Sequence, residues 1–95
     1  MKHGRVTSVT PGIPTQVTSV STPVATVRFQ ALRNNTGYVA IGGSNVRIRD
    51  GEQNAISLAV PAASTPQMQV FTNVNLADLY IDVTVTNEGA AYVWE

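Results

Sequence analysis

Short stretches of alternating apolar and polar residues recur along this chain, and they constrain its fold more than any other feature. The clearest is VATVRFQALR, residues 24–33. An extended chain there carries one set of apolar residues on a single face: Ala25, Val27, Phe29 and Ala31. A period of two is the pattern of a half-buried strand. Because no segment keeps the 3.6-residue period of a helix, the sequence predicts an all-β fold.

The same alternation predicts further strands at residues 36–43, 45–50, 55–60, 67–72 and 81–86. The positions expected to lie together on one face of each strand include Val39, Ile41, Val46, Ile48, Ile56, Leu58, Val60, Ile81, Val83 and Val85. Clusters of turn-forming residues separate the strands: NNTG, GGSN, RDGE, PAASTP and TNEG. Gly, Asn, Asp and Pro supply the backbone angles that turns need. Closely spaced strands joined by such turns predict an antiparallel sandwich or barrel.

The glycine-rich cluster GGSN, residues 42–45, has two interpretations. A phosphate-binding loop would need GxGxxG or GxxxxGK spacing and a helix after it. The residues that follow, VRIRD, alternate like a strand instead. We therefore interpret the cluster as a hairpin turn.

Ninety-five residues are enough for one domain and one modest core. Six basic and six acidic side chains cancel, so we expect neither nucleic acid nor a membrane surface as a partner. Cysteine is absent, which excludes disulfides and thiol chemistry. No apolar run has the length of a secretion signal or a membrane span, so we expect a soluble protein made in the cytoplasm.

Residues 1–23 differ from the rest of the chain. They contain short Val alternations separated by Pro11 and Pro14, with Pro23 at the end. Proline lacks a backbone donor and is excluded from central strands. The sequence therefore predicts an edge strand or extended N-terminal arm at 1–23, followed by a β-sandwich domain at 24–95.

No set of residues predicts catalysis, and we expect no enzyme, no metal site and no cofactor. His3 is the single histidine and lies near a terminus, where a solvated role is expected. Asp50 and Glu52 flank a turn glycine, and Asp78 and Asp82 lie four residues apart. For both pairs we expect solvated or capping roles, because no complementary base is nearby in the sequence. Serine and threonine without a base are not nucleophiles.

Two features near the C-terminus concern packing. Asn75 can cap a short helical turn ending at Asp78, with Leu76 and Leu79 closing one end of the sandwich. Alternation in AAYVWE then places Tyr92 and Trp94 on one face. Those two rings could pack in the core, contact a partner protein or stack on a sugar.

Two sequence blocks resemble small virion proteins of tailed bacteriophages. The first block is Asn35, Thr36, Gly37, Tyr38, Val39 and Gly42. The second block is Leu76, Asp78, Leu79, Tyr80, Ile81 and Asp82. The resemblance covers about residues 16–95. It implies a jelly-roll-like β-sandwich that attaches to a capsid, commonly as a trimer.

The sequence thus predicts a capsid cement or decoration protein on the virion surface. Its expected partners are the major capsid protein and copies of itself in a homotrimer. The residues expected to contact a subunit or the capsid are Ile13, Val17, Val20, Tyr80, Tyr92 and Trp94. One alternative is a fibre-base, neck or tail component. Another is a carbohydrate-binding module whose platforms would be chosen among Tyr38, Tyr80, Tyr92 and Trp94.

Overall fold

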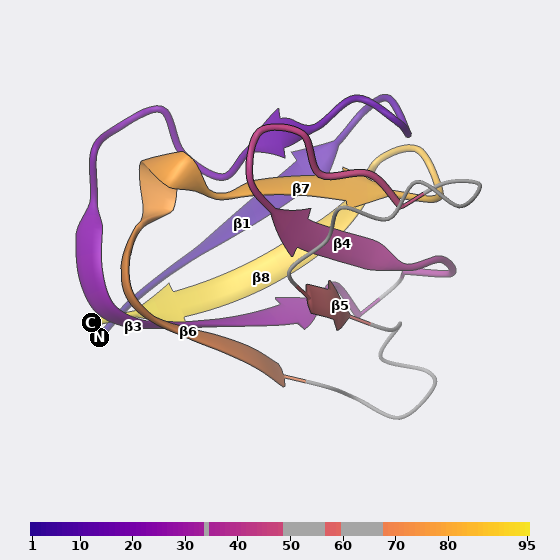
Figure 1. The fold of residues 1–95 in the computed structure, drawn as a ribbon. Coiled ribbons are helices and arrows are strands. Elements are labelled where there is room, and N and C mark those ends of the chain that lie inside the picture. The colour runs from indigo at the N-terminus through magenta and orange to yellow at the C-terminus, as the bar shows by residue number, and fades with distance from the viewer. Residues whose placement is uncertain (34, 49–56, 60–67) are drawn as a thin grey trace.

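The computed structural model describes residues 1–33, 35–48, 57–59 and 68–95. Within them, two antiparallel sheets of four strands pack face to face (Figure 1). The first sheet has the order β1 (Lys2–Ser8), β8 (Glu88–Trp94), β3 (Pro23–Ala31), β6 (Met68–Asn75). The second has the order β2 (Thr15–Gln16), β7 (Tyr80–Val83), β4 (Val39–Gly42), β5 (Ser57–Ala59). The predicted all-β sandwich is confirmed.

The strand order follows one rule. The strands pair antiparallel so that the two strand numbers add up to nine: β1 with β8, β2 with β7, β3 with β6, and β4 with β5. Such pairing is that of one long hairpin folded over into two layers. Within the first sheet β3 also pairs with β8, and within the second sheet β4 also pairs with β7. This is the connectivity of a jelly roll. It also brings the two termini together, with Lys2 opposite Trp94 (Figure 1).

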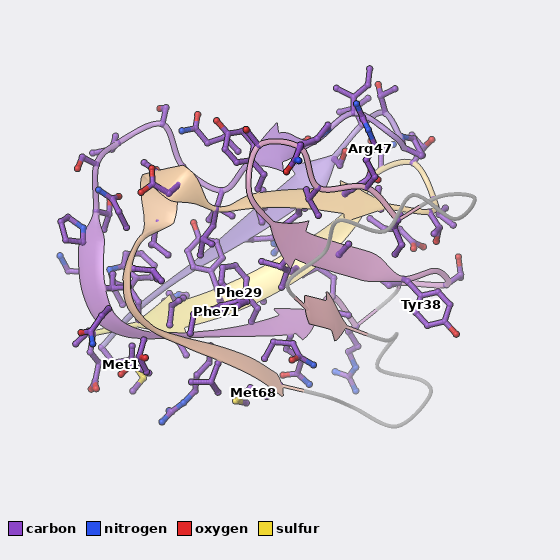
Figure 2. The ribbon with its side chains drawn as sticks, viewed as in Figure 1. Met1, Phe29, Tyr38, Arg47, Met68 and Phe71 are labelled. Carbon is purple, nitrogen blue, oxygen red and sulfur yellow. The ribbon has the colours of Figure 1, made fainter. Side chains whose placement is uncertain are left out.

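Aromatic rings form the centre of the core. Phe29 is fully buried and lies 5.8 Å from Phe71 and 5.4 Å from Tyr92, measured between ring centroids. Trp94 continues the series at 5.4 Å from Tyr92. Figure 2 shows Phe29 and Phe71 between the two sheets. Because Phe29 and Tyr92 are paired across β3 and β8, their inward positions follow from strand alternation.

The predicted turn before β7 is confirmed as a short 3₁₀ helix, η1 (Leu76–Asp78). The Asn75 side-chain oxygen accepts a hydrogen bond from the Ala77 N–H at 3.0 Å, which is the geometry of an N-cap. Leu76 and Leu79 are both buried in the core. The turn that carries Leu76 lies at the end of the sandwich nearest the termini (Figure 1), so the two leucines fill the core at that end, as expected.

Residues 1–23 lie on the domain and form its edges. β1 pairs with β8 along its whole length, and β2 pairs with β7. Val6 and Val17 contribute to the core. Removing this segment would take two strands and two core side chains from the domain.

The strand predicted at 45–50 is wrong for the residues that the structure describes. Val46 is buried, but its N–H bonds the Gly43 carbonyl at 3.0 Å in a turn. The Ile48 N–H donates to an oxygen of Asp82 at 3.1 Å. GGSN is a turn as predicted, but the residues after it form a loop. The N–H groups of Val46 and Ile48 bond Gly43 and Asp82 and not a strand, and both edges of β4 are already paired, with β5 and β7. Residues 49 and 50 lie outside the described ranges.

The strand predicted at 81–86 ends early, at Val83. Residues 84–87 form a turn in which Asn87 adopts a left-handed backbone (φ 66°) and Val85 is exposed. Asparagine tolerates that conformation better than most residues. The alternation of apolar and polar residues therefore continues to Thr86, although the strand has already ended at Val83. Several predicted positions lie outside the described part of the chain: Asp50, Glu52, Ile56 and Val60.

Asp82 is a fully buried carboxylate on the outer side of the second sheet. One oxygen accepts from the Gly12 N–H at 2.8 Å and from its neighbour Val83 at 2.9 Å, and the other from Ile48. Gly12 has φ 90° and follows Pro11 in a turn closed by a bond from the Ile13 N–H to the Thr10 carbonyl. Asp82 therefore holds Gly12 of the β1–β2 loop and Ile48, which follows β4, on the sheet, and Arg47 supports this by donating to the Gly12 carbonyl (Figure 2).

We predict that Asp82→Asn lowers the free energy of unfolding by about 1–3 kcal/mol. Asparagine has an NH₂ group in place of one of the two carboxylate oxygens, so at least one buried N–H then faces another donor. The matched control is Asp78→Asn, the same change at an exposed carboxylate, which should stay within about 0.5 kcal/mol of the parent. Urea unfolding followed by Trp94 fluorescence measures both. Equal losses in the two variants would contradict the assigned role of Asp82.

Candidate functional site: a contact surface at the loop end

Three loops meet at the end of the sandwich opposite the termini (Figure 1). They are the β1–β2 loop (9–14), the β3–β4 loop (32–38) and the β7–β8 loop (84–87). The antiparallel pairing of β1 with β8 and of β4 with β7 brings these loops together. We call this region the loop end.

The carboxylate of Glu88 fixes the β3–β4 loop. One of its oxygens accepts from the Thr36 N–H at 2.7 Å and the Thr36 hydroxyl at 2.9 Å. The other accepts from the Gly37 N–H at 2.9 Å. Glu88 is itself buried at the start of β8. Hydrogen bonds to a charged acceptor are stronger than neutral ones, so this loop is firmly attached to β8.

These contacts set the charge state of Glu88. Burial alone would raise the pKa of its carboxyl group. The N–H groups of Thr36 and Gly37 and the Thr36 hydroxyl outweigh burial and hold the pKa below its ordinary value of 4.5. The fold therefore favours the ionised form of Glu88.

Asn35 makes the second attachment of the same loop. Its side-chain amide donates to the Gly89 carbonyl at 2.8 Å, and its side-chain oxygen lies 3.5 Å from the Gly89 nitrogen. Leu32 also donates to the Gly89 carbonyl, at 3.0 Å. Gly89 has no room for a side chain, because a Cβ atom there would overlap the Val6 carbonyl oxygen. The Asn-Thr-Gly block thus serves to dock a loop on β8.

Hydrogen bonds also join the β7–β8 loop to its neighbours. Tyr38 and Thr84 exchange two bonds: the Tyr38 N–H donates to the Thr84 hydroxyl at 2.9 Å, and the Thr84 N–H to the Tyr38 carbonyl at 3.2 Å. The Asn87 N–H donates to the Ser8 carbonyl at 2.8 Å. The β3–β4 and β7–β8 loops are therefore hydrogen-bonded to each other, the β7–β8 loop is bonded to the end of β1, and the β1–β2 loop is held separately by the bond from Gly12 to Asp82.

Exposed apolar side chains lie on these three loops. Val9 and Ile13 are 68% and 61% exposed, and Tyr38 is 51% exposed. Val85 is also exposed. Tyr38 points away from the ribbon at the loop end (Figure 2). We call these four residues the loop-end surface. Apolar side chains held in place on the surface are suited to a protein contact, because little order is lost on binding.

The structure divides the contact residues predicted from the sequence. Ile13 and Val20 are exposed, at the loop end and at the opposite end respectively. Tyr80 and Trp94 are partly buried. Val17 and Tyr92 lie in the core of this chain. Ile13 is the member of the predicted set that lies on the loop-end surface.

The aromatic residues considered for sugar stacking are placed in the same way. Tyr92 packs between Phe29 and Trp94 inside the sandwich, and burial raises the pKa of its hydroxyl. Core packing, one of the three alternatives for this strand, describes Tyr92. Tyr38 is left as the exposed ring among the four tyrosine and tryptophan candidates.

The predicted contact set does not include Val9, Tyr38 or Val85, and Tyr38 is named there only as a possible sugar platform. Val9 precedes a proline turn and Val85 sits in an alternating stretch, so pattern alone places Val85 in a strand. The useful signal is the Asn87 and Gly89 pair, which marks a turn close behind Val85. That the three loops lie side by side follows only from the strand pairing, which the sequence does not give.

In the part of the chain that the structure describes, no three His, Asp or Glu side chains lie together in a way that could hold a metal ion. No helix among the described residues has the length and apolar character needed to cross a membrane. His3 is exposed on β1. No protein-family model, curated protein or solved structure matches the chain.

We predict that Glu88→Gln destabilises the protein by about 1–3 kcal/mol at neutral pH. The substituted amide places a donor opposite the N–H groups of Thr36 or Gly37. Glu95→Gln is the control, because Glu95 is exposed and should tolerate the change. Thermal and urea unfolding give the comparison, and an unchanged midpoint for Glu88→Gln would contradict the proposed attachment.

The same pair tests the charge state through pH. Because the folded-state pKa of Glu88 lies below 4.5, its contribution is complete above that pH and is lost as the pH falls through the folded pKa. The stability difference between the parent and Glu88→Gln should therefore shrink on acidification. A difference that is constant with pH, or that grows in acid, would be inconsistent with a depressed pKa.

Proposed function

We propose that this chain is a structural protein of a tailed-phage virion, of the cement or decoration type. It attaches to the outer surface of the shell, contacts the major capsid protein, bridges neighbouring capsomers and acts as a homotrimer. The proposal rests on the two sequence blocks that resemble such proteins. Jelly rolls are used in viral capsid domains but also in lectins and cupins, so the fold alone is not specific.

The arrangement of those two blocks is the observation that carries the proposal. The first block, residues 35–42, contains the docked β3–β4 loop and β4. The second block, residues 76–82, contains η1 and most of β7. β4 and β7 are hydrogen-bonded neighbours, with Ala40 opposite Asp82. The residues that carry the resemblance thus meet in two neighbouring strands, with the β3–β4 loop of the first block at the loop end and η1 of the second block at the opposite end.

Attachment would use the loop-end surface. Its apolar side chains stand on loops that hydrogen bonds already hold on the sandwich, so binding immobilises little additional backbone. Each partner in a stable contact typically contributes about 800 Å², whereas four side chains offer less. Attachment by the loop end alone would therefore be weak, and multiple copies acting together would strengthen it.

A neck, fibre-base or tail component remains the alternative within the same class. Copy number separates the two, because a cement protein covers the shell and an attachment component occupies one vertex or the tail. A carbohydrate-binding module has less support, since Tyr92 lies in the core and Trp94 packs against it.

A matched pair of valine substitutions tests the attachment. Val9 at the loop end and Val20 at the opposite end are 68% and 66% exposed, so Val→Asp changes charge and polarity equally at both. Shells of the encoding phage that lack the protein are incubated with each variant, and bound protein is quantified after sedimentation. We expect Val9→Asp to lower occupancy by about tenfold, since a buried unpaired carboxylate costs more than 1 kcal/mol. Val20→Asp should bind like the parent.

Failure of the parent protein to bind such shells would contradict the cement function. Loss of binding by Val20→Asp alone would place attachment at the end nearest the termini and contradict the loop-end surface. Point substitutions are preferable to deleting residues 1–23, because that segment supplies β1, β2 and two core residues. Analytical ultracentrifugation of the parent tests the homotrimer.

A further inference from the structure

Strand pairing arranges the outward-facing residues of the first sheet in two rows that cross its strands in the order β1, β8, β3, β6. The first row is His3, Val93, Arg28 and Val70. The second row is Arg5, Ala91, Gln30 and Met68. Each row therefore alternates a basic or polar residue with an apolar one. Basic residues lie on β1 and β3, and apolar residues lie on β8 and β6.

A groove of about 350 Å³ runs over this face. Ala91 at its centre has a short side chain, whereas its surroundings carry long ones: His3, Arg28, Gln30 and Met68. The difference in side-chain length creates the depression. Met68, at the β6 side of the groove, is exposed (Figure 2). The groove thus has an apolar floor on β8 and longer side chains on both sides.

The charge on this face is positive although the whole chain is neutral. Arg5 and Arg28 are exposed on the strands either side of β8, and His3 is exposed beside Val93. Glu95 lies beyond the first row, where its N–H bonds the Thr26 carbonyl at 3.0 Å. Positive charge therefore flanks the apolar floor, and the acidic group stands at one end of it.

We propose that this groove binds an extended, acidic and aliphatic segment of a partner protein. Alternate residues of an extended chain are spaced like Ala91 and Val93, about 7 Å apart, so aliphatic side chains of the segment fit over those two residues. Neighbouring strands lie about 4.8 Å to each side, which brings Arg5 and Arg28 within reach of carboxylates on the segment. The inference deepens the proposed function, under which the segment belongs to the capsid.

Charge and ring placement favour this occupant over two others. A second copy placed on the same face would offer these arginines one acidic side chain, Glu95, and otherwise the basic side chains of its own two rows. Single-stranded nucleic acid binds through exposed aromatic rings, whereas Phe29, Tyr92 and Trp94 point to the inner side of this sheet. An acidic protein segment satisfies both the charge and the apolar floor.

The test uses NMR of the isotopically labelled protein and needs no capsid. The probe is a short synthetic peptide of alternating Glu and Val. We expect amide shifts concentrated at Ala91, Val93 and Arg28, with affinity that falls as salt is added. Arg28→Glu should weaken binding about tenfold, because attraction is replaced by repulsion. Lys2→Glu is the control: it makes the same charge change on β1, but Lys2 lies opposite Trp94, in register with inward positions.

Four results would overturn the proposal. The first three are equal binding of a Lys and Val peptide, tighter binding of oligothymidylate, and absence of shifts at the groove. The fourth is a set of groove shifts that depend on protein concentration without peptide, which would indicate a second copy as occupant. If shells bind the parent but the peptide does not, the groove inference fails and the cement function stands. If the peptide binds and shells do not, the cement function fails and the groove inference stands.

Discussion

The pairing of β8 with both β1 and β3 is the interaction on which the rest of this structure depends. It places the last strand of the chain inside the first sheet, between the first strand and the third. Glu88 and Gly89 then lie where they can hold the β3–β4 loop, and Tyr92 lies where it can pack on Phe29. Ala91 and Val93 face the opposite side, between basic strands. A single strand thus serves the core, the loop end and the groove.

Two of the six acidic residues in this weakly charged chain are used to fasten loops. Asp82 accepts N–H groups from the β1–β2 and β4–β5 loops, and Glu88 accepts N–H groups from the β3–β4 loop. Buried carboxylates are tolerated when their oxygens receive several hydrogen bonds. In a chain without cysteine, these bonds do work that a disulfide would do elsewhere: they hold loops against strands.

The strands and the capped turn were predictable because their causes are local. Alternation identified β3, although Ala25, expected on the inward face, is exposed and Val24 is buried instead, because the pairing with β6 skips Ala25. Asn75 before Leu76 identified η1. Alternation failed at Val46–Ile48 and after Val83, where distant groups decide the conformation: the Asp82 carboxylate for the first, and the Tyr38 and Ser8 carbonyls for the second. The loop-end surface and the groove were not predicted. They depend on strand register, which places residues far apart in sequence, such as Val9 and Tyr38 or His3 and Arg28, on one surface.

The register of β8 can be measured directly by nuclear Overhauser effects in the labelled protein. Cross-strand contacts of β8 report its two neighbours at once, since Ala91 should lie opposite Arg5 on one side and Gln30 on the other. The account predicts contacts from Ala91 to both residues and from Tyr92 to both Gly4 and Phe29. A register shifted by one residue would turn Tyr92 outward and Ala91 inward. That result, or contacts to only one of the two strands, would contradict the account.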